Sequence, residues 1–87
     1  MTRLYFEPIT VHLEDGPEGT RPLTFTWRHR VHHVTTVLKR WIVRVDWWRQ
    51  EIARQYYKVE CDNLGTYEIY CERHPKGTRW FLERLYD

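Results

Sequence analysis

The chain has 87 residues, of which 41% are hydrophobic, 30% charged and 16% aromatic, and its formal net charge is +2. That length allows one small domain, residues 1–87, near the size at which a single core becomes marginal. Composition excludes a disordered or fibrous chain, and no apolar stretch reaches the ~20 residues of a membrane span. A glycine-rich nucleotide loop is absent too, because the four glycines stand apart.

The N-terminal part predicts a β-hairpin. Hydrophobic and polar residues alternate over 9–13 and again over 23–27, which is the two-residue period of a half-buried strand. Between the two runs lies a turn-rich stretch with Gly16, Pro17 and Gly19. Residues 28–30 are a short polar break.

The run 31–45 contains neither Gly nor Pro and is ambiguous between helix and strand. Several of its apolar residues fall at helical spacing. Its many β-branched residues suit a pleated sheet better. We predict one long strand with a bulge or bend near Thr36–Leu38, and whether 34–45 is wholly strand stays open.

The C-terminal half predicts three more strands. Residues 46–54 read as a polar connection with room for one helical turn, and alternation returns over 57–61 and 67–71. Turn residues at 62–65 and 74–77 separate these runs, and 79–86 reads as a closing strand. The predicted fold is all-β: a small antiparallel meander of about six strands forming a half-open, SH3-like barrel with a long bent central strand.

Charge is distributed unevenly along the chain. Residues 1–27 hold two arginines against four acids, and residues 59–87 hold four basic residues against six acids. Residues 28–58 hold eight basic residues against two acids, so the middle third is a basic band. Eleven of the fourteen basic residues are Arg, which binds phosphate through paired donors and stacks on bases.

Aromatic side chains accompany this band, and the combination is typical of surfaces that bind single-stranded nucleic acid. We expect one group of residues to contact phosphate: Arg28, Arg30, Lys39, Arg40, Arg44 and Arg49. Trp47, Trp48 and Tyr56 are the candidates for base stacking. The alternative is that the arginines are solvated strand faces and the tryptophans are core.

Signals for other chemistry are weak. The two cysteines cannot form a disulfide scaffold, and in a hairpin turning at 63–65 Cys61 would face a residue near position 68, not Cys71. Two buried free thiols and the lack of a signal peptide lead us to expect a cytoplasmic protein. Among the metal-ligand types His33, Cys61, Cys71 and His74, the only close pair is Cys71 and His74, and the sequence has no second pair of the CxxC type. We therefore expect no metal, no cofactor and no catalytic residues.

Several strings look like a family of small uncharacterised bacterial domains. They are Glu7-Pro8-Ile9, Thr24-Phe25-Thr26-Trp27-Arg28, Val37-Leu38-Lys39-Arg40-Trp41, Trp47-Trp48, Tyr57-Lys58-Val59-Glu60, Tyr67-Glu68-Ile69-Tyr70 and Trp80-Phe81-Leu82-Glu83-Arg84-Leu85-Tyr86-Asp87. That family occurs alone and at the C-terminus of Y-family translesion polymerase paralogues of mutagenesis cassettes. The resemblance implies a place in DNA damage tolerance and carries over no functional residues. This chain departs from the family pattern at two places. His29 stands where a turn glycine is expected, and the segment between Trp41 and Trp47 contains no glycine.

Two functions follow as expectations. The first is a non-catalytic accessory domain that binds single-stranded nucleic acid, DNA in particular, in translesion synthesis or repair. The second is a protein-interaction module that docks a Y-family polymerase or its accessory proteins, its clamp, or a second copy of itself as a homodimer. Trp, Tyr and Arg also dominate protein interfaces, so composition does not separate the two functions.

Overall fold

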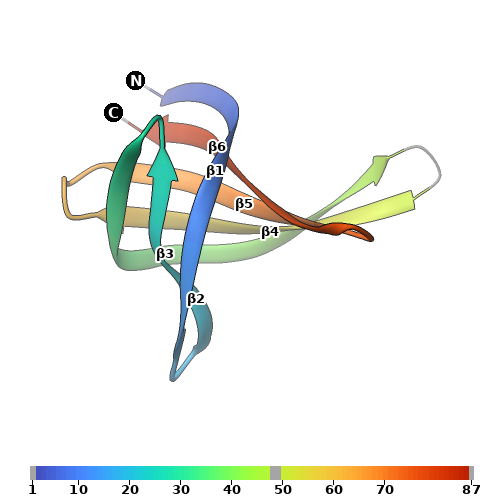
Figure 1. Cartoon of the computed structure of the whole chain (residues 1–87), viewed down its shortest axis with the longest axis horizontal. Coiled ribbons are helices and arrows are strands. Elements are labelled where there is room, and N and C mark those ends of the chain that lie inside the picture. Colours follow the sequence, from blue (N-terminus) through green and yellow to red (C-terminus); the bar gives the residue numbers. More distant parts are fainter. Residues whose placement is uncertain (1, 48–49, 87) are drawn as a thin grey trace.

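The structure is a computed structural model that describes residues 2–47 and 50–86, with the backbone alone at Trp47. It forms a closed barrel of antiparallel strands in which each strand pairs with its neighbours in sequence (Figure 1). The strands are β1 (Thr2–Gly16), β2 (Gly19–Trp27), β3 (Arg30–Trp47), β4 (Gln50–Cys61), β5 (Thr66–His74) and β6 (Gly77–Tyr86). The all-β antiparallel meander of six strands predicted from alternation is thus confirmed.

The ring is closed rather than half-open, because β1 has two partners. Its first half pairs with β6, from Thr2 opposite Tyr86 to Ile9 opposite Trp80. Its second half pairs with β2, from Thr10 opposite Thr26 to Gly16 opposite Gly19. Closure pairs β1 with β6, whereas in a half-open sheet each of these strands would have an unpaired edge.

Strand β3 is the long bent strand expected from the sequence. Its ladder with β4 shifts register between Val34 and Thr36 and again between Val37 and Lys39, which places bulges in the predicted region. Its pairing with β2 covers only residues 30–33, so β3 then leaves β2 and continues with β4 as a projecting arm (Figure 1).

The polar connection predicted over 46–54 is wrong. Both strands continue into that segment, where Asp46 pairs with Glu51 and the backbone of Trp47 pairs with Gln50. The hydrophobic alternation fades there because Asp46, Gln50 and Glu51 are exposed, so polar side chains cost nothing. Residues 48–49, between the two strands, lie outside the described residues.

The antiparallel order separates the turns into two ends. The β1–β2 and β5–β6 turns lie at one end, which we call the mouth, together with Trp47 and Gln50, where β3 ends and β4 begins. The β2–β3 and β4–β5 turns lie at the other, which we call the core end, together with Thr2 and Tyr86 (Figure 1).

The core fills the barrel interior toward the core end. Phe25, Val59, Ile69 and Leu82 have no exposed surface. Partly buried rings, including Tyr5, Trp27 and Trp80, pack against this cluster. Many of the chain's aromatic residues are therefore needed for folding.

Both cysteines are free and buried, as the sequence predicted. The expected register at Cys61 is wrong by about three residues: Glu60 pairs with Thr66, and the Cys61 amide donates to the carbonyl of Gly65. Burial raises the pKa of the Cys61 thiol to about 12, so it stays protonated at neutral pH.

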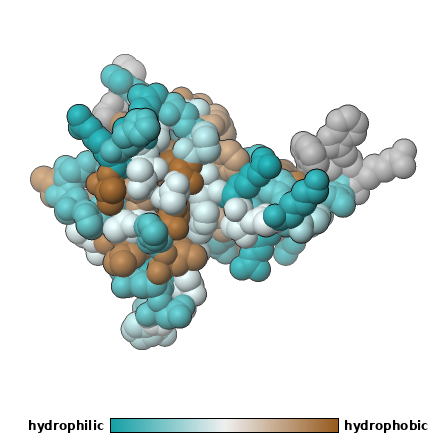
Figure 2. Space-filling model, viewed as in Figure 1, coloured by the Kyte–Doolittle hydropathy of each residue, from teal (hydrophilic) through white to brown (hydrophobic). Residues whose placement is uncertain are grey.

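The surface is mixed over the barrel body. Figure 2 shows hydrophobic side chains interspersed with polar ones there, and hydrophilic side chains gathered on the projecting β3–β4 arm. Among residues 2–47 and 50–86, none belongs to a helix long and apolar enough to cross a membrane.

Candidate functional site at the barrel mouth

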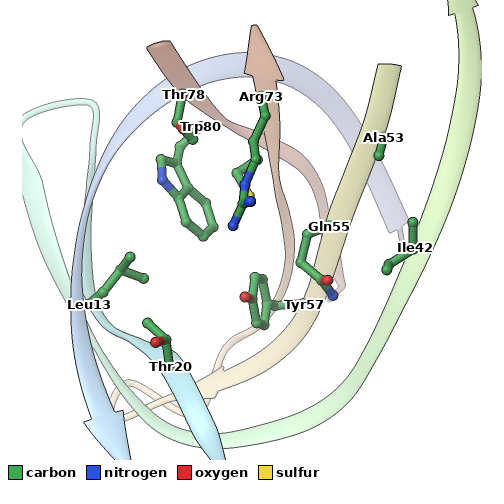
Figure 3. Close-up of a pocket in the computed structure, with 10 residues that line it drawn as sticks. Leu13, Thr20, Ile42, Ala53, Gln55, Tyr57, Arg73, Thr78 and Trp80 are labelled. Carbon is green, nitrogen blue, oxygen red and sulfur yellow. The ribbon is translucent and has the colours of Figure 1, made fainter. Parts of the chain in front are cut away.

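A cavity of about 640 Å³ opens at the mouth, on the inner side of the barrel (Figure 3). All of β1, β2, β3, β4, β5 and β6 contribute to its wall. The lining residues are Leu13, Thr20, Ile42, Ala53, Gln55, Tyr57, Cys71, Arg73, Thr78 and Trp80. They face inward together because side chains alternate between the two faces of a strand and the ring brings the inner faces opposite one another.

Two flat rings form the inner part of this wall. Tyr57 and Trp80 stack with centroids 5.7 Å apart and an interplanar angle of 27°. Tyr57 is 8% exposed, and burial raises the pKa of its hydroxyl, which is therefore neutral at physiological pH. Trp80 is half-buried and projects into the cavity (Figure 3).

Two arginines lie beside this cavity: Arg73 lines it, and Arg40 contacts two residues that line it, Thr20 and Tyr57. The guanidinium of Arg40 donates from Nη1 to the carbonyl of Thr20, 3.2 Å away, and its Cζ lies 5.7 Å from the Tyr57 ring centroid. Arg40 thereby bridges the gap between β3 and β2. Arg73 is exposed and extends toward Gln55 and Tyr57 (Figure 3). Within the described part of the chain, neither arginine forms an ion pair with a carboxylate.

Arg28 and Arg30 were predicted to contact phosphate at the same surface, but they lie at the core end. Arg28 already has a partner, since its Nη2 is 2.7 Å from Oε2 of Glu7. Its guanidinium also lies 5.0 Å from the Tyr5 ring centroid and 4.8 Å from that of Trp27. The basic band therefore does not form one continuous surface.

Arg28 and His29 also explain how the chain turns without the glycine expected at His29. Both have positive φ, 51° and 65°, the conformation that a tight hairpin turn requires at its central residues. The pairing of Arg28 with Glu7 and its ring contacts help to hold a backbone that L-residues rarely adopt.

Lys39 and Arg44 lie on different faces of the β3–β4 arm. The Nζ of Lys39 is 5.1 Å from the Trp41 ring centroid on the outer face. Arg44 is exposed and its Nη1 lies 3.3 Å from Oε1 of Glu51. Exposed pairs of this kind contribute little to stability.

Tyr56 was predicted as an exposed stacking platform, and this is wrong. It is 6% exposed and lies on the outer face, between Trp41 and Tyr70, with ring centroids 5.1 and 4.9 Å away. Tyr70 in turn stacks on Phe81 at 5.3 Å. A row of rings across four strands occupies Tyr56 in packing and leaves its ring no free face.

Three predicted side chains lie outside the described part of the structure. Trp48 and Arg49 lie outside the described residues, and only the backbone of Trp47 is described, at the end of β3. Of the predicted residues whose side chains are described, Arg40 does not line the cavity but contacts Thr20 and Tyr57, which do.

Arg73 and Trp80 are the site residues that sequence reasoning missed. Arg73 lies outside the basic band, in a segment with more acids than bases, and Trp80 reads simply as part of the closing strand. The sequence signal that could have found them is the alternation of side chains between the two faces of a strand. Cys71 and Arg73 face the same side of β5, and Cys71 pairs with Trp80 on β6.

A metal centre is not evident in the part of the chain that the structure describes, where no three His, Cys, Asp or Glu side chains gather in a suitable group. The fold and the cavity together define a class: a small closed antiparallel barrel with a basic, aromatic-lined mouth.

The chain belongs to the family described as Domain of unknown function (DUF6504), whose model matches residues 1–87. This confirms the part of the sequence resemblance that concerns a family of uncharacterised small domains. Comparison with curated proteins and with solved structures finds no match.

Proposed function

We propose that the chain is a non-catalytic accessory domain that binds single-stranded nucleic acid, and single-stranded DNA in particular, at the barrel mouth. The observation that carries the proposal is the placement of Arg40 and Arg73, without carboxylate partners in the described chain, beside the stacked rings of Tyr57 and Trp80. A guanidinium without an acid partner is available to bind an anion.

The chemistry of the mouth suits this class of ligand. Proteins that bind single strands combine positive charge for the backbone with aromatic rings for the bases, and each stacked base contributes ~1–3 kcal/mol. Arg40 approaches Tyr57 in the way that a guanidinium stacks on a planar ring. Stacking on the rings of the recess favours a single strand, because the bases of a duplex are already stacked inside the helix.

Translesion synthesis or repair is the setting that we propose for this binding. It rests on the sequence resemblance to domains attached to Y-family polymerase paralogues. In that setting the domain would hold template or displaced strand close to the polymerase.

The test is fluorescence anisotropy of a labelled oligothymidine titrated with the protein at several salt concentrations. We expect binding at low salt that weakens as salt rises, with a slope of ~0.7 per phosphate contacted. Arg40→Gln and Arg73→Gln should each weaken binding and reduce that slope by about one contact. Circular dichroism of each variant checks that the fold is retained.

Arg30→Gln is the matched control, because it removes the same charge at the core end and should change neither affinity nor slope. Equal weakening in this variant would mean that net charge, not the mouth, drives binding. No detectable binding at low salt would overturn the proposal.

A protein-interaction module is the second candidate, and one observation favours it. The β2–β3 ladder ends at the pair Thr24 and His33, and beyond it Leu23 on β2 and Leu38 on β3 are exposed. Apolar side chains beside an unpaired strand edge are typical of docking sites for a polymerase, its clamp or a second copy.

Salt separates the two candidates. An apolar interface should survive ~0.5 M salt, whereas phosphate contacts should not. In a pull-down from nuclease-treated extract at that salt, retention of a polymerase subunit by the protein would favour the interaction module. The retention should be lost in Leu38→Asp and kept in Arg73→Gln.

A further inference from the structure

The cavity at the mouth is a blind recess, and this limits what can enter it. Tyr57 belongs to the core cluster and Trp80 packs against it, so the two stacked rings close the inner end. Beyond them the barrel is filled by side chains with no exposed surface, including Ile69 and Leu82. A nucleic-acid strand cannot pass through the barrel and can present only one unit to the recess at a time.

The recess has the size and composition of a small-molecule pocket. Its volume of about 640 Å³ falls within the ~300–1,000 Å³ typical of such sites. Leu13 and Ile42 supply apolar wall, while Gln55 and Thr78 add an amide and a hydroxyl (Figure 3). The amide nitrogen of Gln55 already donates to the carbonyls of Trp41 and Tyr56, so Gln55 offers the ligand its carbonyl oxygen as an acceptor. The hydroxyl of Thr78 can donate and accept, so the two side chains together suit the polar edge of a nucleobase.

Charge is confined to the rim. Arg73 extends into the opening, and Arg40 is held across the gap between β3 and β2 by its bond to Thr20. On the arm, Asp46 and Glu51 lie opposite each other in the β3–β4 ladder, and Glu51 forms an ion pair with Arg44. Asp15 accepts a hydrogen bond from the hydroxyl of Thr20 at the rim. A ligand with a flat polar ring inside and an anionic group at the opening matches this layout.

We propose that the mouth binds a single unstacked nucleotide, with its base against Trp80 and its phosphate at Arg73 and Arg40. This inference rests on the proposed function and specifies its mode: the strand is held through one base turned into the pocket, not along a row of platforms. The cost of unstacking is small for a base that is already single-stranded.

The test is a titration of the protein with each deoxynucleoside 5′-monophosphate, followed by NMR at the indole N–H of Trp80, which is assigned with Trp80→Phe. We expect saturable movement of that resonance. Ribose 5-phosphate should compete poorly because it lacks the base, and phenyl phosphate poorly because it lacks polar ring edges. Arg73→Gln should weaken nucleotide binding roughly tenfold or more, as expected for a charged hydrogen bond.

Arg79→Gln is the matched control. Arg79 lies on β6 between Thr78 and Trp80, so its side chain points to the opposite face of the strand. Its removal changes the local charge equally and should leave nucleotide affinity unchanged. Equal weakening by Arg79→Gln would overturn the pocket assignment.

The remaining outcomes are distinguishable. Oligothymidine binding without any Trp80 response to nucleotides would overturn the pocket and leave the proposed function standing. Nucleotide binding at Trp80 without oligothymidine binding would support the pocket and overturn the proposed function. Equal affinity for phenyl phosphate would overturn the nucleotide assignment in favour of any aromatic phosphate, a phosphotyrosine peptide included.

Discussion

At the core end an arginine is bound by both an acid and aromatic rings, whereas at the mouth Arg73 lines an open cavity beside the rings of Tyr57 and Trp80. Arg28 pairs with Glu7 and lies between the rings of Tyr5 and Trp27. Arg73 has no carboxylate partner in the described chain. Arg beside an aromatic ring is therefore not by itself a sign of function. The presence or absence of a local acid is what separates a structural arginine from an available one.

Core packing gives the largest expected difference between the two ends. Phe25 has no exposed surface, with Tyr67 5.3 Å away and His32 4.9 Å away between ring centroids. Phe25→Ala should lower the free energy of unfolding by ~3–5 kcal/mol, measured by urea denaturation. Ile42→Ala, at the mouth and 57% exposed, should stay within ~0.5 kcal/mol of the parent. Similar losses in both variants would break the comparison.

The acid side of the core-end ion pair should appear as a pH dependence. Hydrogen bonds from Arg28 and Trp27 lower the pKa of Glu7 below its usual 4.5. Its contribution to stability is therefore complete above the unfolded pKa and is lost as the pH falls through the folded pKa. Glu7→Gln should flatten the acid limb of a plot of melting temperature against pH.

The difference in melting temperature between the parent and Glu7→Gln at each pH isolates Glu7. This comparison is needed because Glu68 changes the stability in the opposite direction. Burial raises the pKa of Glu68, so its contribution to stability is complete below the unfolded pKa and is lost as the pH rises through the folded pKa. Arg73→Gln serves as the control at the mouth and should leave the acid limb unchanged. Identical pH profiles for Glu7→Gln and the parent would show that the ion pair does not stabilise the core end.

The turn at the core end should give the smallest effect. His29 has a φ of 65°, which disfavours an L-residue, so His29→Gly should raise the free energy of unfolding by up to about 1 kcal/mol. Arg30→Gly, one residue later in β3 and outside the positive-φ set, should instead destabilise by ~0.5–1 kcal/mol. A loss of stability in both variants would show that the His29 side chain contributes more than its backbone costs.

Local periodicity was sufficient to predict most of the fold. Alternation identified strand positions, and the β-branched run over 31–45 identified the long bent strand. Ring closure could not be predicted in this way, because the partner of Thr2 is Tyr86, at the far end of the chain. The extension of the arm past Asp46 was missed because a strand exposed on both faces has no hydrophobic period.

The site was predicted less well, for a different reason. Because Arg28, Lys39 and Arg40 are close in sequence, the prediction placed them in one basic band. In the barrel, Arg28 lies at the core end, Lys39 on the outer face and Arg40 toward the mouth. Tyr56 and Tyr57 are adjacent and face opposite sides, and both are buried because the outer face carries its own row of rings. Only the register of β5 with β6 brings Arg73 and Trp80 together.

The pairing of Thr2 with Tyr86 has a consequence for how this domain can be carried by other proteins. Flanking polypeptide joined to either terminus would depart from one side of the molecule, with the recess turned away from it. The domain could thus be appended to, or inserted within, a larger host without obstructing its opening. A circular permutant that links the two termini and is cut in the β1–β2 turn should fold to the same ring.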